Sequence, residues 1–145
     1  MEIKYLLDTS ILAEFSKKNP DPNVMAAFKK VKSKCAISVI TWQELMTSVI
    51  LEKDESRKRF LSECLQTLGL NFLVVPFERD EAALAADMTA HFADFSDAVP
   101  PQACQLFATA LFNKYTVVTH NSVYLELFHN NPGIKIEDWF ESKEK

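Results

Sequence analysis

Residues 3–12, with the sequence Ile-Lys-Tyr-Leu-Leu-Asp-Thr-Ser-Ile-Leu, decide the fold. The apolar segment 3–7 predicts a short buried strand, and residues 10–17 predict a short helix that Asp8 or Thr9 can cap. Asp8 therefore stands where a strand ends and a helix begins. Ligands of open α/β folds bind at the carboxyl ends of strands, so Asp8 is the first candidate site residue, although capping alone would also explain it.

A second segment repeats this arrangement. Residues 35–39 predict an apolar strand, and residues 42 to about 53 predict a helix capped by Thr41, with Glu44 at its third position as in a capping box. Either acid alone needs no role beyond capping. Two acids just past neighbouring strands predict a divalent metal site, because hard oxygen ligands suit Mg²⁺ or Mn²⁺. Such ions assist the cleavage of phosphodiesters.

The rest of the chain alternates between helices and strands. Further helices are predicted at about 22–32, 55–68, 78–92, 102–113 and 122–128, and further strands at 72–76, 116–119 and 134–136. The helix over 55–68 is expected to end at Gly69. This alternation predicts a three-layer α/β fold, with a mostly parallel sheet of four or five strands flanked by about seven helices. We expect a single domain covering residues 1–145.

Composition limits the classes of function. The net charge of −4 argues against a protein that holds nucleic acid by a generally basic surface. The only two glycines, Gly69 and Gly133, lie outside any phosphate-binding loop, which excludes P-loop and dinucleotide-binding folds.

The expected location is the cytoplasm. No apolar segment approaches the roughly 20 residues of a membrane span, and we recognise no secretion signal. The three cysteines, Cys35, Cys64 and Cys104, lack metal-ligand spacing, and an odd count fits reduced, buried thiols.

Five blocks, in this order, resemble the PIN domain family, and more closely the VapC-type toxins of bacterial toxin–antitoxin pairs. The blocks are 5–14, 36–45, Leu106 with 108–111, 117–121 and 136–139. The resemblance covers essentially the whole chain. It implies a ribonuclease fold that acts on RNA, a cluster of three or four acids holding Mg²⁺, a homodimer, and a small antitoxin that blocks the site.

Two of the family's acids are carried over by this resemblance, Asp8 as the first and Glu44 as the second, and both are candidate catalytic residues and metal ligands. Thr9 or Ser10 matches a hydroxyl that supports the cluster, and Thr119 and Asn121 remain as polar groups. The third and fourth acids are missing, because Ala103 and Tyr124 occupy their positions. Asp94 and Asp97, in the loop before the helix over 102–113, are considered as substitutes, with ordinary loop acids as the simpler interpretation.

The main hypothesis is a metal-dependent endoribonuclease of the toxin type, with activity reduced by the two missing acids and with weak binding of Mg²⁺ or Mn²⁺. The alternative is a PIN-like domain without catalysis that binds RNA or a protein. A response-regulator-like domain is disfavoured, because one loop does not hold an acidic pair and the expected lysine after a late strand is missing. His120 is interpreted as a polar residue at the rim of the site, and Trp42 and Trp139 as packing residues.

Overall fold

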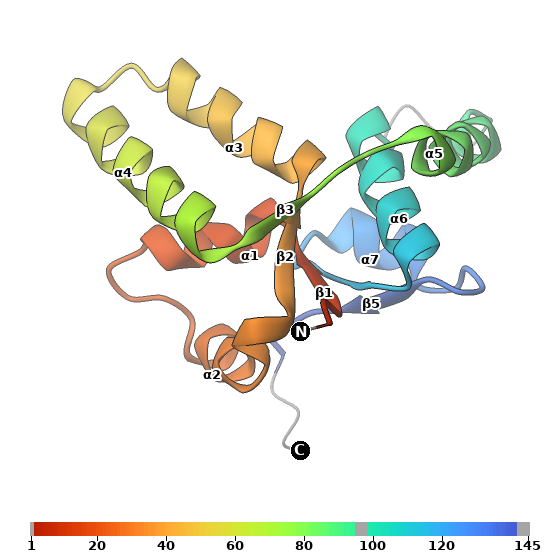
Figure 1. Ribbon diagram of the computed structural model, residues 1–145, viewed down its shortest axis with the longest axis horizontal. Helices are drawn as coiled ribbons and strands as arrows, with labels where there is room; N and C mark the ends of the chain where they lie inside the picture. Colours follow the sequence, from red (N-terminus) through yellow and green to blue (C-terminus); the bar gives the residue numbers. More distant parts are fainter. Residues whose placement is uncertain (1, 95–98, 142–145) are drawn as a thin grey trace.

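The protein is described by a computed structural model that covers residues 2–94 and 99–141. Within these residues, five parallel strands form one sheet in the order β3-β2-β1-β4-β5 (Figure 1). The strands are β1 (Tyr5–Leu7), β2 (Cys35–Ser38), β3 (Leu73–Val75), β4 (Thr116–Val118) and β5 (Lys135–Glu137). The predicted parallel sheet is confirmed.

Seven α-helices within the described residues cover both faces of this sheet, which confirms the predicted three-layer α/β fold. They are α1 (Thr9–Leu12), α2 (Pro22–Val31), α3 (Val39–Leu51), α4 (Glu55–Asn71), α5 (Arg79–Phe92), α6 (Pro101–Asn113) and α7 (Ser122–Phe128). Short 3₁₀ turns, η1 (Ala13–Ser16) and η2 (Lys32–Lys34), follow α1 and α2, so the helix predicted over 10–17 is divided between α1 and η1. Helices α3 and α4 form a hairpin on one side of the sheet, and α5 and α6 lie on the other (Figure 1).

The strand order creates a switch point beside the central strand. From β1 the chain adds β2 and β3 on one side, and it then returns to add β4 and β5 on the other. The connections leaving β1 and β4 therefore run in opposite directions along the sheet. The crevice between their carboxyl ends is where open α/β folds bind ligands.

Alternation along the strands divides the core into two clusters. Leu6 points to the face covered by α5, α6 and α7, where it joins Phe107 and Phe128 in one cluster. Leu7 points to the opposite face, in a cluster with the fully buried Ile11 and Val24. The strands β1 and β2 are largely apolar and buried, as in other sheets covered by helices on both sides, whereas the edge strand β5 carries the charged residues Lys135 and Glu137.

Helix α3 begins three residues earlier than predicted. Ser38, at the end of β2, is its N-cap, and its hydroxyl accepts a hydrogen bond of 3.1 Å from the N–H of Thr41. The predicted Thr41 cap and its capping box with Glu44 are therefore wrong. The extended backbone of Ser38 suits an N-cap, so the helix starts as soon as the strand ends. Glu44 becomes the sixth residue of α3, and its carboxylate is not used in capping.

Gly69 does not end α4, which continues to Asn71. A Cβ at position 69 would lie 3.0 Å from Cη2 of Trp42 on α3. The glycine therefore permits the close approach of the two helices instead of stopping one. The interpretation of Trp42 as a packing residue agrees with this contact, and Trp139, 3% exposed, packs in the same cluster.

Cys35 and Cys104 are buried as predicted, whereas Cys64 is half-buried. All three are free thiols. Over residues 2–94 and 99–141, no helix has both the length and the apolar character needed to cross a membrane.

Replacing Ser38 with alanine should lower the free energy of unfolding by about 1 kcal/mol, because the N–H of Thr41 loses its acceptor in a buried environment. Urea denaturation followed by circular dichroism measures this change. Ser48→Ala, on the same helix, is the matched control and should change stability little, since Ser48 is exposed and only bonds back to the carbonyl of Glu44. Equal losses for the two variants would contradict the assignment of the cap.

Candidate functional site

Asp8 lies at the switch point and is held there by backbone and side-chain hydrogen bonds. Its N–H donates to the carbonyl of Val118 over 3.0 Å, which continues the pairing of β1 with β4 by one residue. The hydroxyl of Thr119 donates to Oδ2 of Asp8 over 2.7 Å, and the hydroxyl of Ser10 lies 3.2 Å from the same oxygen. Asp8 is only 3% exposed. Among the described residues, Oδ1 accepts one hydrogen bond, a long one of 3.5 Å from the hydroxyl of Thr9, so Oδ1 is the freer of the two oxygens.

Glu44 reaches the same site from α3. Its carboxyl group is half-buried, and the pKa is raised from its usual 4.5 by burial and, secondarily, by the negative charge of Asp8. Asp8 therefore lies near enough to Glu44 to influence its pKa, although the two residues are 36 positions apart in the sequence. The two acids predicted from the sequence thus influence each other electrostatically, and their roles as catalytic residues and metal ligands stay predictions.

The acidic pair lacks a positive partner. Among the described residues, neither Asp8 nor Glu44 forms an ion pair with a lysine, arginine or histidine. The donor set is two carboxylates, and no group of three His, Cys, Asp or Glu side chains in residues 2–94 and 99–141 is arranged to hold a metal ion. Two carboxylates with water and substrate phosphate are enough for Mg²⁺, so the pair fits one weakly held divalent ion.

Neither of the two positions where the resemblance implies further acids carries a carboxylate. Ala103, in the first turn of α6, is 1% exposed and presents a methyl group. Tyr124, on α7, has its pKa raised to about 12 by burial, by the charges of Asp8 and Glu44, and by Cys104. The phenol therefore stays neutral near the carboxylates.

The predicted supporting residues divide into two groups. Thr9, Ser10 and Thr119 contact the carboxylate of Asp8. The side chain of Asn121 instead caps α7, where it accepts hydrogen bonds from the N–H groups of Val123 and Tyr124. The backbone N–H of Asn121 reaches the cluster indirectly, by donating to the hydroxyl of Thr119 over 3.1 Å.

The two loop acids considered as substitutes are not brought into this cluster by any described contact. Asp94 is exposed in the turn that follows α5. Asp97 lies outside the described residues. Substitution by either remains a hypothesis.

A histidine–carboxylate pair lies next to the cluster. The N–H of His120 donates to the hydroxyl of Ser10 over 2.9 Å, and its Nδ1 lies 2.8 Å from Oδ2 of Asp138. The ring stacks on Phe140, with centroids 4.0 Å apart, and its side chain is 53% exposed. This exposure agrees with the interpretation of His120 as a rim residue, whereas its partner Asp138 was not predicted from the sequence.

Glu14, on η1, is a further buried acid, and it was not predicted from the sequence. Burial opposes ionisation of Glu14, but hydrogen bonds from Lys17 and from the N–H of Asp21, together with the charge of His120, leave its pKa lower than usual. Glu14 is therefore satisfied by its own turn. The one sequence signal for Glu14 is its position at the end of the block 5–14, which also contains Asp8. Membership of this block does not distinguish a structural acid from a metal ligand.

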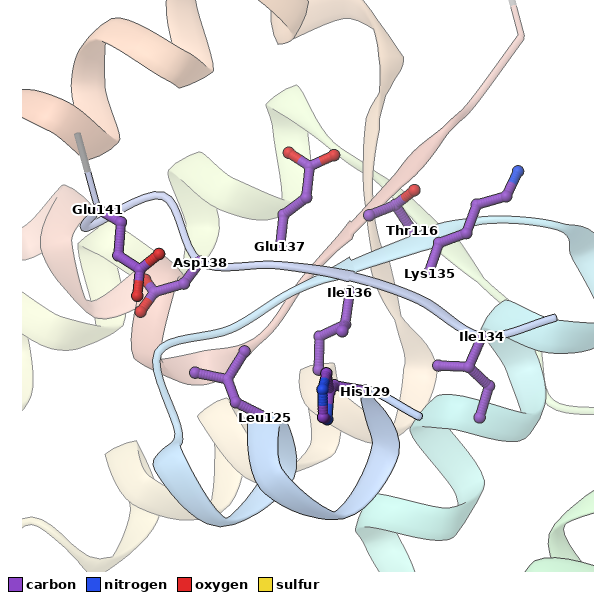
Figure 2. Close-up of a pocket in the computed structure, with 9 residues that line it drawn as sticks. All are labelled: Thr116, Leu125, His129, Ile134, Lys135, Ile136, Glu137, Asp138 and Glu141. Carbon is purple, nitrogen blue, oxygen red and sulfur yellow. The ribbon is translucent and has the colours of Figure 1, made fainter. Parts of the chain in front are cut away.

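A cleft of about 620 Å³ lies away from the acidic pair, between β5 and α7 (Figure 2). Ile134 and Ile136 point toward α7, where Leu125 and His129 lie, and Lys135 and Glu137 point to the other side of the strand (Figure 2). The cleft follows the edge strand of the sheet. It is not lined by Asp8 or Glu44, so its size does not make it the reactive site.

Comparison with known proteins gives one family and one group of structures. Residues 5–129 match the model of the PIN domain family. A search of curated proteins finds no match.

Three crystal structures illustrate the structural similarity. FitAcB from Neisseria gonorrhoeae aligns at 22% identity with a TM-score of 0.79, covering 95% of this chain and 99% of that chain. DNA-bound VapBC from Salmonella typhimurium aligns at 28% identity with a TM-score of 0.76, covering 94% and 98%. VapBC-5 from Mycobacterium tuberculosis, a member of a family of toxin–antitoxin systems, aligns at 19% identity with a TM-score of 0.69, covering 93% and 98%.

Glu44→Gln should stabilise the protein at neutral pH in the absence of divalent ions. Folding raises the pKa of Glu44, so the wild-type protein loses stability as pH rises from below 4.5 through the raised value, and glutamine removes that loss. Denaturation by urea at pH 4 and pH 7, in a chelating buffer, measures the difference. Glu63→Gln, at an exposed position of α4, is the control. A gain for Glu44→Gln that is equal at both pH values would contradict the proposed repulsion.

Proposed function

Because this chain belongs to the PIN domain family, we propose that it is a metal-dependent endoribonuclease and the toxin component of a toxin–antitoxin pair, with a partly degenerate acidic cluster. This proposal is carried by the two acids Asp8 and Glu44 at the switch point of the sheet. Neither acid forms an ion pair with a basic residue in the described part of the chain. Two carboxylates brought together without a cation are costly unless an ion or a proton joins them.

Asp8 and Glu44 are the residues that would hold Mg²⁺ or Mn²⁺ in this proposal. The ion would neutralise charge on a phosphodiester and make a water more acidic. Thr119 and Ser10 orient Asp8 by donating to Oδ2, which leaves Oδ1 as the oxygen that would bind the ion. Hydrogen bonds of this kind from surrounding groups fix the geometry of metal-binding side chains.

Ala103 and Tyr124 set the expected level of activity. A methyl group and a neutral phenol replace two carboxylates, so a second ion or a well-oriented water lacks ligands. Loss of one member of a cooperating catalytic set reduces rates by orders of magnitude. We therefore expect slow cleavage and weak binding of the ion.

A small antitoxin, a homodimer and a cytoplasmic location complete the proposal. The similarity to VapBC from Salmonella typhimurium, at 28% identity, supports an antitoxin partner. The α3–α4 hairpin exposes large apolar side chains, including Met46, Ile50, Leu51 and Phe60, which suit contact with another protein. Free cysteines support a reducing compartment.

The second candidate function is a PIN-like domain without catalysis that binds RNA or a protein. The specific observation in its favour is that Ala103 and Tyr124 stand at the two positions where the resemblance implies acids, and that the phenol of Tyr124 stays neutral near Asp8 and Glu44. Fewer carboxylates repel a phosphate less, so RNA binding can persist where cleavage is lost.

Asp8→Asn should reduce RNA cleavage at least about a hundredfold, because the amide is a poor ligand for Mg²⁺ and the remaining set holds one acid. The measurement is cleavage of a mixture of single-stranded RNAs with Mg²⁺ or Mn²⁺, compared with a chelator. Asp87→Asn, at an exposed position of α5, is the matched control and should leave the rate unchanged. Full activity in Asp8→Asn would exclude the proposed role of Asp8.

Combining Ala103→Asp with Tyr124→Asp should raise the metal-dependent cleavage rate about tenfold or more if the frame otherwise supports catalysis. Tyr124 packs against Phe107 and Phe128, with ring centroids 6.0 and 6.5 Å away, so stability falls and must be followed by circular dichroism. Tyr124→Phe is the control, because it keeps the ring and removes only the hydroxyl. If the natural chain already cleaves as fast as the folded double variant, the interpretation of these positions as gaps is wrong.

A further inference from the structure

A second cleft, of about 530 Å³, adjoins the acidic pair. It lies between α3 and the beginning of α6, and Glu44 is one of its lining residues. The chain contains four glutamines, and three of them, Gln43, Gln102 and Gln105, line this cleft. We refer to it as the glutamine cleft.

The three side-chain amides are available to a ligand. Within residues 2–94 and 99–141, no hydrogen bond joins the amide of Gln43, Gln102 or Gln105 to the protein. Gln102 and Gln105 are half-buried, and Gln43 is exposed. Each amide offers two donors and a carbonyl acceptor, so one glutamine can make paired hydrogen bonds to a planar polar edge.

Two hydroxyls add acceptors to the same cleft. Thr47 donates its proton to the carbonyl of Gln43 over 2.9 Å, and Ser48 donates to the carbonyl of Glu44 over 3.1 Å. Both oxygens keep lone pairs that can accept from a ligand. Apolar contact comes from Ile40 and Pro101, which also line the cleft.

The charge of the glutamine cleft opposes a phosphate. None of the residues that line it within the described part of the chain is basic, and Glu44 is the one ionisable group. Phosphate recognition requires lysine, arginine or a comparable donor array. A flat, neutral ligand with donor and acceptor edges satisfies the amides, the hydroxyls and the apolar contacts together.

We propose that the glutamine cleft binds an unpaired nucleobase of the RNA next to the phosphodiester at Asp8 and Glu44, and that Gln43, Gln102 and Gln105 read its polar edge. The inference rests on the proposed function, because RNA is the substrate there. In a duplex the pairing edges are used and the major groove is too narrow for side chains, so the substrate must be single-stranded at this position. Glutamine makes paired hydrogen bonds to adenine in other complexes, and a neutral amide can serve any base edge.

The test measures binding with cleavage prevented. The full-length Asp8→Asn protein is titrated into fluorescein-labelled, single-stranded oligoribonucleotides of A, C, G or U, and fluorescence anisotropy gives each Kd. One base should bind at least about tenfold more tightly than the weakest. Equal affinity for all four, or binding to none, would overturn the proposal.

Two variants, one double and one single, connect the preference to the glutamine cleft. Gln102→Ala with Gln105→Ala should reduce the preference to less than about threefold, and Gln43→Ala, at an exposed position that does not threaten folding, should reduce it in the same direction. Gln66→Ala is the matched control, since Gln66 is exposed on α4 and outside the cleft. Equal weakening of all four oligonucleotides would overturn the proposal.

Abasic substitution at each nucleotide of the preferred RNA completes the test. One abasic position should weaken binding as much as the double glutamine variant, and combining the two should bring no further loss, because both remove the same contact. If the losses in affinity from the abasic position and from the double glutamine variant added together, the proposed contact between the base and the glutamines would be contradicted.

The same reagents separate this inference from the proposed function. Base-selective binding by a chain that does not cleave RNA with Mg²⁺ or Mn²⁺ would support the glutamine cleft and reject the nuclease. Cleavage without any base preference would support the nuclease and reject the glutamine cleft.

Discussion

The hydrogen bond between the N–H of Asp8 and the carbonyl of Val118 extends the pairing of the two strands at the switch point, and the rest of the site depends on it. It brings Asp8 beside Thr119, whose hydroxyl then holds Oδ2 at 2.7 Å. Since β1 is the central strand and both faces of the sheet are buried, this position cannot shift without disturbing two apolar clusters. A rigid sheet thus fixes a carboxylate in an almost completely buried position, which is the kind of support that a precise site requires.

Electrostatic repulsion is the consequence of adding Glu44 to this position. The raised pKa of Glu44 reflects burial and the charge of Asp8, and the pair lacks a basic neighbour among the described residues. A divalent ion relieves such repulsion, and protonation of Glu44 is the other way to relieve it. Tyr124 fills the nearby space with a neutral ring that also packs on Phe107 and Phe128, so stability and catalysis make different demands on this residue.

The acidic pair and the glutamine cleft divide the proposed recognition of RNA between charge and shape. In this proposal the pair would act on the phosphodiester through an ion, and a contact of that kind carries no sequence information. The cleft offers neutral donors and acceptors beside it, which suit a base and disfavour a phosphate. Glu44 belongs to both regions, so α3 positions the carboxylate and begins the surface that selects the base.

The order of strands and helices, the parallel sheet and the acid at the end of β1 were predictable from the residues alone, because apolar runs and helix periodicity are local signals and the inner strands are largely apolar. Local signals failed where a choice depended on packing: Ser38 replaced Thr41 as a cap, and Gly69 served the approach of Trp42 instead of ending α4. Three features become visible only in the folded chain. They are the hydrogen bond between Thr119 and Asp8, which are 111 residues apart, the contact of His120 with Asp138, and the cleft lined by three glutamines. These three features depend on which strands are adjacent in the sheet and on how the helices pack against it. No local residue pattern specifies such long-range packing.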